Sequence, residues 1–205
     1  MDKDSTIDRP PPSNLGAGMK YFPYHLIAAA NDWIDQSSAD QTKAETQLSE
    51  ASQRYGRDLD RLKPRIGLRA WEFFQHGFGP TGLHDGRLLS MRIGDGLDFA
   101  VDGTKPFRLN HQRLAVRLEF LNYEQDLDYV FDLRGVDSIQ SHLFLDHCGK
   151  GFGDVYIYEI SATDDDNLQL AFLFASGAAV VVQFRKLVFR RRRIDRRYAV
   201  GEMYS

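Results

Sequence analysis

The sequence predicts an α+β protein in which N-terminal helices pack on a curled antiparallel β-sheet of six to eight strands. Two observations support this fold class. Before Gly77, apolar residues recur every three or four positions, as on one face of a helix, whereas after Gly77 they alternate at every second position, as in half-buried strands. The connections between the later runs are short, and short connections require antiparallel neighbours.

Three helices are expected, over Tyr24–Asp35, Asp40–Leu62 and Arg65–His76. The second has the clearest pattern, because its apolar residues from Ala44 to Leu62 follow each other in steps of three and four. Pro64 is expected in the first turn of the third helix, where the missing N–H of a proline is tolerated. Gly77 is expected to end that helix.

The strands are expected at seven alternating runs: Leu89–Ile93, Leu97–Val101, Leu114–Phe120, Leu127–Leu133, Tyr156–Ile160, Leu168–Phe174 and Val180–Phe184. The first two read as a hairpin across the turn 94–96. After Phe184 the next apolar residues are Leu187 and Phe189, so the apolar positions shift from even to odd. This slip predicts a β-bulge at Arg185–Lys186, with Phe184 and Leu187 both facing the core.

The chain divides into a disordered arm over residues 1–18, a helical segment over 19–80 and an antiparallel β region over 81–205, with the last two expected to form one compact unit. Met19 is an alternative start to Met1. Hydrophobic residues make up 42% of the 205, enough to exclude disorder of the whole chain. The single cysteine excludes an internal disulfide, and the longest apolar runs are too short for a membrane span. A cytoplasmic protein without a membrane partner is therefore expected.

The charge is unevenly distributed. The segment Arg185–Arg197 contains eight basic residues and one acid, about +7, which leaves about −10 for the rest of a chain whose net charge is −3. Three interpretations of this basic segment are open: protection and internal pairing of an edge strand, contact with a protein, or contact with nucleic acid. Nucleic acid is the least favoured partner, because the acidic remainder repels a polyanion.

Two groups of charged residues are candidates for binding a protein partner. The basic group is Arg190, Arg191, Arg192 and Arg193, and the acidic group is Glu124, Asp126 and Asp128. The acidic group would steer a basic partner such as a nuclease. Its alternative role is the solvent face of two strands.

His84 and Asp85 at the entry to the β region are candidates for general acid–base chemistry. As neighbours in a strand they would point to opposite faces and could not pair, so capping of the strand entry is the alternative. His142, His147 and Cys148 form a second cluster, but their spacing does not supply a closed zinc site. No metal, no cofactor and no catalytic residue is therefore assigned, and these five residues remain loop candidates.

The segment Met19-Lys20-Tyr21-Phe22 and the run Leu83-His84-Asp85-Gly86-Arg87-Leu88-Leu89 resemble those of a loose group of uncharacterised bacterial proteins. In that group a helical part precedes an antiparallel β region that begins at an L-H-D strand, and similar small α+β proteins occur among toxin-immunity proteins. The resemblance implies a bacterial, cytosolic protein and supplies no catalytic residues.

The leading hypothesis is a non-enzymatic protein-binding module of the immunity or antitoxin kind, with a toxin among its candidate partners. The alternatives are an enzyme that uses the His, Asp and Cys residues above, and a nucleic-acid-binding regulator that uses the C-terminal arginines. The sequence makes no prediction of the oligomeric state.

Overall fold

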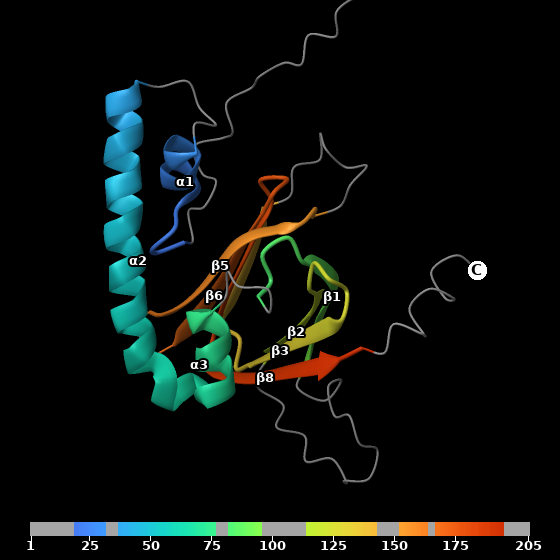
Figure 1. Ribbon diagram of the computed structural model, residues 1–205. Coiled ribbons are helices and arrows are strands. Elements are labelled where there is room, and N and C mark those ends of the chain that lie inside the picture. The colour runs from blue at the N-terminus through green and yellow to red at the C-terminus, as the bar shows by residue number, and fades with distance from the viewer. Residues whose placement is uncertain are drawn as a thin grey trace, which may run out of the picture.

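The computed structural model describes residues 19–31, 37–76, 82–95, 114–142, 152–163 and 167–194. Over these residues the protein is α+β, with three helices and two antiparallel sheets of four strands each (Figure 1). The prediction of a single curled sheet of six to eight strands is therefore wrong. The predicted arm at 1–18 lies outside the described residues.

The helices are α1 (Tyr24–Ala30), α2 (Ser38–Ile66) and α3 (Leu68–Gln75). Pro64 lies inside the last turn of α2, so its predicted place in the first turn of the next helix is wrong. The break between the two helices is instead at Gly67, whose φ of +81° is a backbone conformation that glycine adopts readily. Helix α2 runs along one side of the molecule, and α3 turns back under the sheets (Figure 1).

The strands are β1 (Arg87–Asp95), β2 (Leu114–Leu121), β3 (Leu127–Arg134), β4 (Ser138–His142), β5 (Val155–Ala162), β6 (Leu168–Phe174), β7 (Ala179–Phe184) and β8 (Lys186–Arg193). One sheet has the order β1-β2-β3-β8 and the other β4-β7-β6-β5. Strand β1 pairs with β2, and the predicted return strand over 97–101 lies outside the described residues. Strand β4, polar and half exposed, was not predicted.

The two sheets are joined where the chain passes from one to the other, between β3 and β4 and between β7 and β8. At this corner Asp137 donates its N–H to the carbonyl of Gln183 over 2.9 Å. Phe184 and Leu187 are both buried, as the predicted slip requires. The predicted β-bulge at Arg185–Lys186 is wrong, however: β7 ends at Phe184, β8 begins at Lys186, and the two strands belong to different sheets, so the slip marks a change of sheet.

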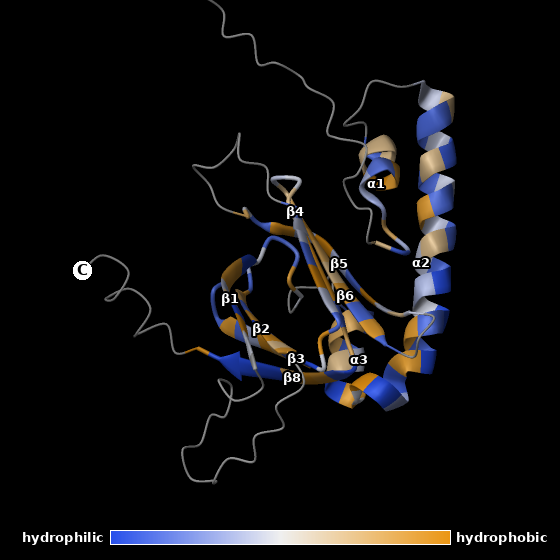
Figure 2. Ribbon diagram, turned by 180° about the vertical axis from the view of Figure 1, so that it is seen from behind, coloured by the Kyte–Doolittle hydropathy of each residue, from blue (hydrophilic) through white to orange (hydrophobic). Residues whose placement is uncertain are grey.

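The core lies between the sheets and extends under the helices. The rings of Phe120 (β2) and Phe172 (β6) lie 4.5 Å apart between their centroids, so the two sheets pack face to face. Helix α2 covers the outer edge of β5, where the Tyr55 hydroxyl accepts the backbone N–H of Ile160 over 3.3 Å. In Figure 2, β8 is hydrophobic where it begins beside α3 and hydrophilic toward its end.

A buried carboxylate fixes the segment that precedes α1. Glu159 of β5 is fully buried and accepts the backbone N–H groups of Lys20, Tyr21 and Phe22, the second over 2.9 Å and the third over 3.2 Å. Burial raises the pKa of Glu159, and the three N–H donors act in the opposite direction. This anchor ties the start of the described chain to the second sheet.

Candidate functional site: a cleft between α3 and β8

The predicted basic group divides between the two faces of β8. Strand β8 is the outer strand of its sheet, and successive side chains point to opposite faces. On one face Arg190 lies 2.6 Å from the carboxylate of Asp132, and Arg192 donates to Asp128. Both carboxylates are almost fully buried. This is the internal pairing that the sequence left open for these arginines.

Asp132 is shared between two arginines. Arg117 of β2 lies directly opposite it in the strand register, and their side chains approach to 2.6 Å. The buried aspartates on this face of the first sheet are thus paired with arginines from neighbouring strands. A buried charge without such a partner would destabilise the fold strongly. Arg190 and Arg192 therefore serve the sheet itself.

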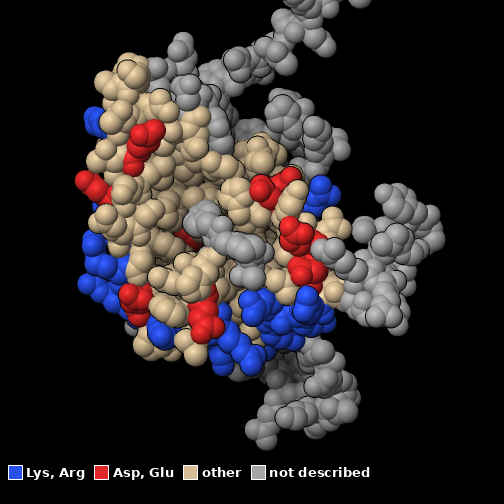
Figure 3. Space-filling model, viewed as in Figure 1, with Lys and Arg blue, Asp and Glu red and all other residues tan. Residues whose placement is uncertain are grey.

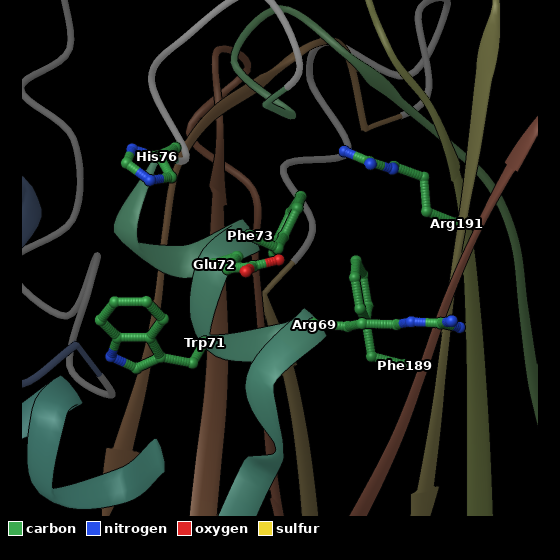
Figure 4. Close-up of a pocket in the computed structure, with 7 residues that line it drawn as sticks. All are labelled: Arg69, Trp71, Glu72, Phe73, His76, Phe189 and Arg191. Carbon is green, nitrogen blue, oxygen red and sulfur yellow. The ribbon is translucent and has the colours of Figure 1, made fainter.

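Arg191 lies on the other face of β8, in line with Leu187 and Phe189. With α3 it lines a cleft of about 620 Å³. Figure 4 shows the lining residues: Arg69, Trp71, Glu72, Phe73, His76, Phe189 and Arg191. Arg69 extends from α3 toward β8, and Arg191 extends from β8 back toward α3 (Figure 4).

Aromatic rings form the wall of the cleft. Phe73 stacks on Tyr158 of β5, with 5.2 Å between ring centroids and 19° between planes. It also lies 4.8 Å from the ring of Phe189 and 5.1 Å from that of Tyr129. Because these rings come from α3 and three strands of both sheets, the wall of the cleft is part of the packed core and is preorganised.

The positive charges of the cleft lack carboxylate partners. Within the described part of the chain, neither Arg69 nor Arg191 forms an ion pair, in contrast to Arg190 and Arg192. Burial raises the pKa of the Tyr129 hydroxyl, and the nearby Arg191 guanidinium opposes that shift. The cleft thus presents two guanidinium groups beside an aromatic wall, with Glu72 as a hydrogen-bond acceptor at the same place.

Trp71, which also lines the cleft, packs against the end of α2. Its indole N–H donates to Asp60 over 3.1 Å, and the ammonium of Lys63 lies 3.9 Å from its ring centroid. These contacts fix the rotation of α3 about its axis. They therefore fix the direction in which Arg69 projects.

The sequence did not identify the α3 side of the cleft, because its residues were interpreted as ordinary helix packing. The available signal was spacing: Arg69 and Glu72 are three residues apart on one face of α3, and His76 follows at its C-terminal end. The spacing does not predict which strand packs against this face of the helix.

The predicted acidic group is not a continuous free surface. Asp128 is buried and holds Arg192, whereas Glu124 and Asp126 lie in the turn between β2 and β3. Asp126 accepts the side-chain amide of Asn122 over 2.8 Å, which closes that turn. Of the predicted acidic group, only Glu124 and Asp126 therefore remain at the surface.

His84 and Asp85 do pair, contrary to the prediction that neighbours in a strand point apart. Their side chains lie 2.9 Å apart between Nδ1 and Oδ2. The physical reason is that they occupy a turn, with Asp85 at a φ of +59°. The backbone of Asp85 also donates to the carbonyl of Val155, and the N–H of Val155 donates to Gly86, so the segment clamps the first strand to β5.

The second histidine cluster is only partly described. His142 is exposed at the end of β4, and His147 and Cys148 lie outside the described residues. Among the residues that the structure does describe, no group of three or more His, Cys, Asp or Glu side chains is placed to hold a metal ion.

No family model matches this chain, and neither the curated proteins nor the solved structures contain a similar one. In the described part of the chain no helix combines the length and apolar character needed to cross a membrane.

Proposed function

We propose that this protein is a non-enzymatic protein-binding module that receives an acidic segment of a partner protein in the cleft between α3 and β8. The observation that supports this most strongly is the contrast within β8. Arg190 and Arg192 are paired with buried aspartates, whereas Arg191 and the facing Arg69 form no ion pair with any described residue. A partner carboxylate would supply the missing counter-charge, and guanidinium groups bind carboxylates in a bidentate geometry.

The aromatic wall supports a protein segment as the occupant. Arginine and aromatic side chains are the residues that most often dominate binding energy at protein interfaces. The rings of Phe73 and Phe189 are fixed by the core, so a side chain that packs on them would bind without much ordering of the cleft. The resemblance to small immunity proteins makes a toxin the first partner to test.

Selection of displayed random peptides against the purified protein tests the proposal. We expect the selected peptides to be enriched in Asp and Glu, with an aromatic or apolar residue nearby. Replacement of Arg69 or Arg191 by Gln should weaken binding of a selected peptide at least about tenfold, because a hydrogen bond to a charged group contributes about 1.5–3 kcal/mol.

Arg134→Gln is the matched control, since Arg134 is exposed at the end of β3 and does not line the cleft. Its substitution should leave peptide binding unchanged. Enrichment of no acidic motif, or equal binding by the cleft variants and the control, would contradict the proposal. Retention of nucleic acid that is lost in the Arg191 variant would support the nucleic-acid alternative instead.

A further inference from the structure

A second basic cleft lies between the segment that precedes α1 and the C-terminal half of α2. Its volume is about 390 Å³, and its lining residues are Lys20, Tyr21, Arg54, Arg57, Asp58 and Arg61. Figure 3 shows Lys and Arg side chains gathered in this region at the left edge of the molecule, apart from those along β8 at the bottom. The cleft shares no lining residue with the α3–β8 cleft.

The helical period places the arginines together. Arg54, Arg57 and Arg61 are three and four residues apart, so they project from one face of α2. Lys20 approaches the same cleft from the opposite side. Cations therefore converge from two elements that are distant in the sequence.

The position of Lys20 is fixed by contacts below the cleft. Glu159 accepts the backbone N–H groups of Lys20 and Tyr21, and the ring of Tyr21 packs 5.2 Å from that of Tyr55. The ammonium of Lys20 lies 5.2 Å from the Tyr21 ring centroid. The backbone at Lys20 is thus fixed by the core, while its exposed side chain remains at the cleft.

The one carboxylate in the cleft is already satisfied. Asp58 accepts the Tyr21 hydroxyl over 2.6 Å and lies 2.9 Å from the guanidinium of Arg61. The Tyr21 hydrogen bond is the main cause that lowers the pKa of Asp58, so this side chain is ionised at neutral pH. With four cations and one anion, the cleft still carries a net charge of +3.

Three of the four cations form no salt bridge within the described residues, although Lys20 lies close enough to Asp58 and Glu159 to interact electrostatically with both. Lys20, Arg54 and Arg57 form no ion pair with any residue of the described chain, although the whole protein has a net charge of −3. Uncompensated like charges held close together destabilise a fold unless a ligand neutralises them. This pattern indicates an anionic ligand that carries more than one charge.

We propose that this cleft binds a small, multiply charged phosphate compound. The volume suits a ligand of this size, and the arginine fork matches the oxygens of a phosphate group. Inorganic polyphosphate and a nucleoside di- or triphosphate share this chemistry. The site is independent of the proposed function of the α3–β8 cleft.

Isothermal titration calorimetry with pyrophosphate, tripolyphosphate, sulfate, ATP and adenosine tests this proposal. We expect tripolyphosphate to bind with one molecule per chain, more tightly than sulfate, and adenosine alone not to bind. Tighter binding of ATP than of tripolyphosphate would identify a nucleotide as the source of the phosphate, and equal or weaker binding would identify an inorganic phosphate chain. The double variant Arg54→Gln/Arg57→Gln should bind at least about tenfold more weakly, since each lost charged hydrogen bond contributes roughly tenfold or more.

Lys43→Gln is the matched control, because Lys43 is an exposed cation on the same helix outside the cleft. Both substituted positions of the double variant are exposed, so their thermal unfolding should match that of the wild type. Failure of tripolyphosphate to bind at roughly millimolar concentration in about 50 mM salt would overturn the proposal. So would equal loss of binding in the double variant and in Lys43→Gln.

Discussion

Replacement of Glu159 by Ala removes the acceptor that holds the segment before α1. The bonds from the N–H groups of Tyr21 and Phe22 are buried, and each donor left without a partner costs about 1–3 kcal/mol. The two together cost about 2–6 kcal/mol, and relief of the buried charge offsets part of that loss. We therefore expect the free energy of unfolding to fall, by up to about 6 kcal/mol.

Glu159→Gln is the graded comparison. The Gln carbonyl oxygen can still accept the N–H groups of Tyr21 and Phe22, which both bind Oε2 in the wild type. Its amide group would face the N–H of Lys20, so one donor loses its acceptor. The expected cost is about 1–3 kcal/mol, smaller than that of the Ala variant.

The pH dependence follows from the raised pKa of Glu159. Because the folded state binds this proton more readily than the unfolded state, the carboxyl group stabilises the fold most at acidic pH. This contribution is lost as the pH rises from the usual value of 4.5 through the folded-state pKa. The stability advantage of the wild type over Glu159→Gln should therefore be largest in acid and shrink toward neutral pH.

Urea unfolding of the three proteins at a series of pH values measures these differences. Amide hydrogen exchange at Lys20, Tyr21 and Phe22 should accelerate in the Ala variant before the rest of the sheet is affected. An Ala variant as stable as the wild type would refute the assignment of Glu159 as an anchor. A wild-type advantage over Gln that grows with pH would refute the sign of the pKa shift.

Three further predictions concern stability. Gly86→Ala should lower the free energy of unfolding by about 1–3 kcal/mol, because a Cβ at this position would lie 2.6 Å from a backbone carbonyl oxygen of β2. Gly56→Ala in α2 has open space around the new Cβ and should raise the free energy of unfolding by about 0.5–1 kcal/mol in the same denaturant titration. Arg190→Gln should lower the unfolding midpoint more than Arg193→Gln, because only the first substitution removes the ion pair with the buried carboxylate of Asp132. Equal midpoints for the two variants would contradict this pairing. Asp58→Asn should be less stable than the wild type at neutral pH, and the difference should vanish as the pH falls through the lowered pKa of Asp58; a difference independent of pH would be the contrary result.

The strands could be predicted well because strongly apolar residues recur at every second position of the sequence. Strands β3 (Leu127–Arg134) and β6 (Leu168–Phe174) coincide with predicted runs to within one residue, although the structure buries both faces of each strand almost completely. Strand β4 could not be found this way, because its side chains are largely exposed and polar and its pairing depends on the backbone of β7. The alternation of apolar and polar residues shows which face of a strand is apolar. It does not show which strands belong to the same sheet.

The candidate sites depend on contacts between distant segments. The arginine group was visible in the composition, but the strand register with β3 determines which of its members pair with a carboxylate. Arg191 and Arg69 are more than a hundred residues apart in the chain, and they meet because α3 packs on β8. The sequence analysis excluded a His84–Asp85 pair because it assumed that both residues lie in a strand. They lie in a turn, and in that conformation the two side chains can pair.

Site-specific photo-cross-linking in living cells tests the binding role of the α3–β8 cleft most directly. A benzophenone amino acid at Gln75, an exposed position on α3 that does not line the cleft, places the probe beside the proposed contact. We predict a covalent adduct with a partner protein through an acidic segment, present with Arg134→Gln and lost with Arg69→Gln/Arg191→Gln. An adduct that persists in the cleft double variant, or whose cross-linked segment is not acidic, would contradict the account.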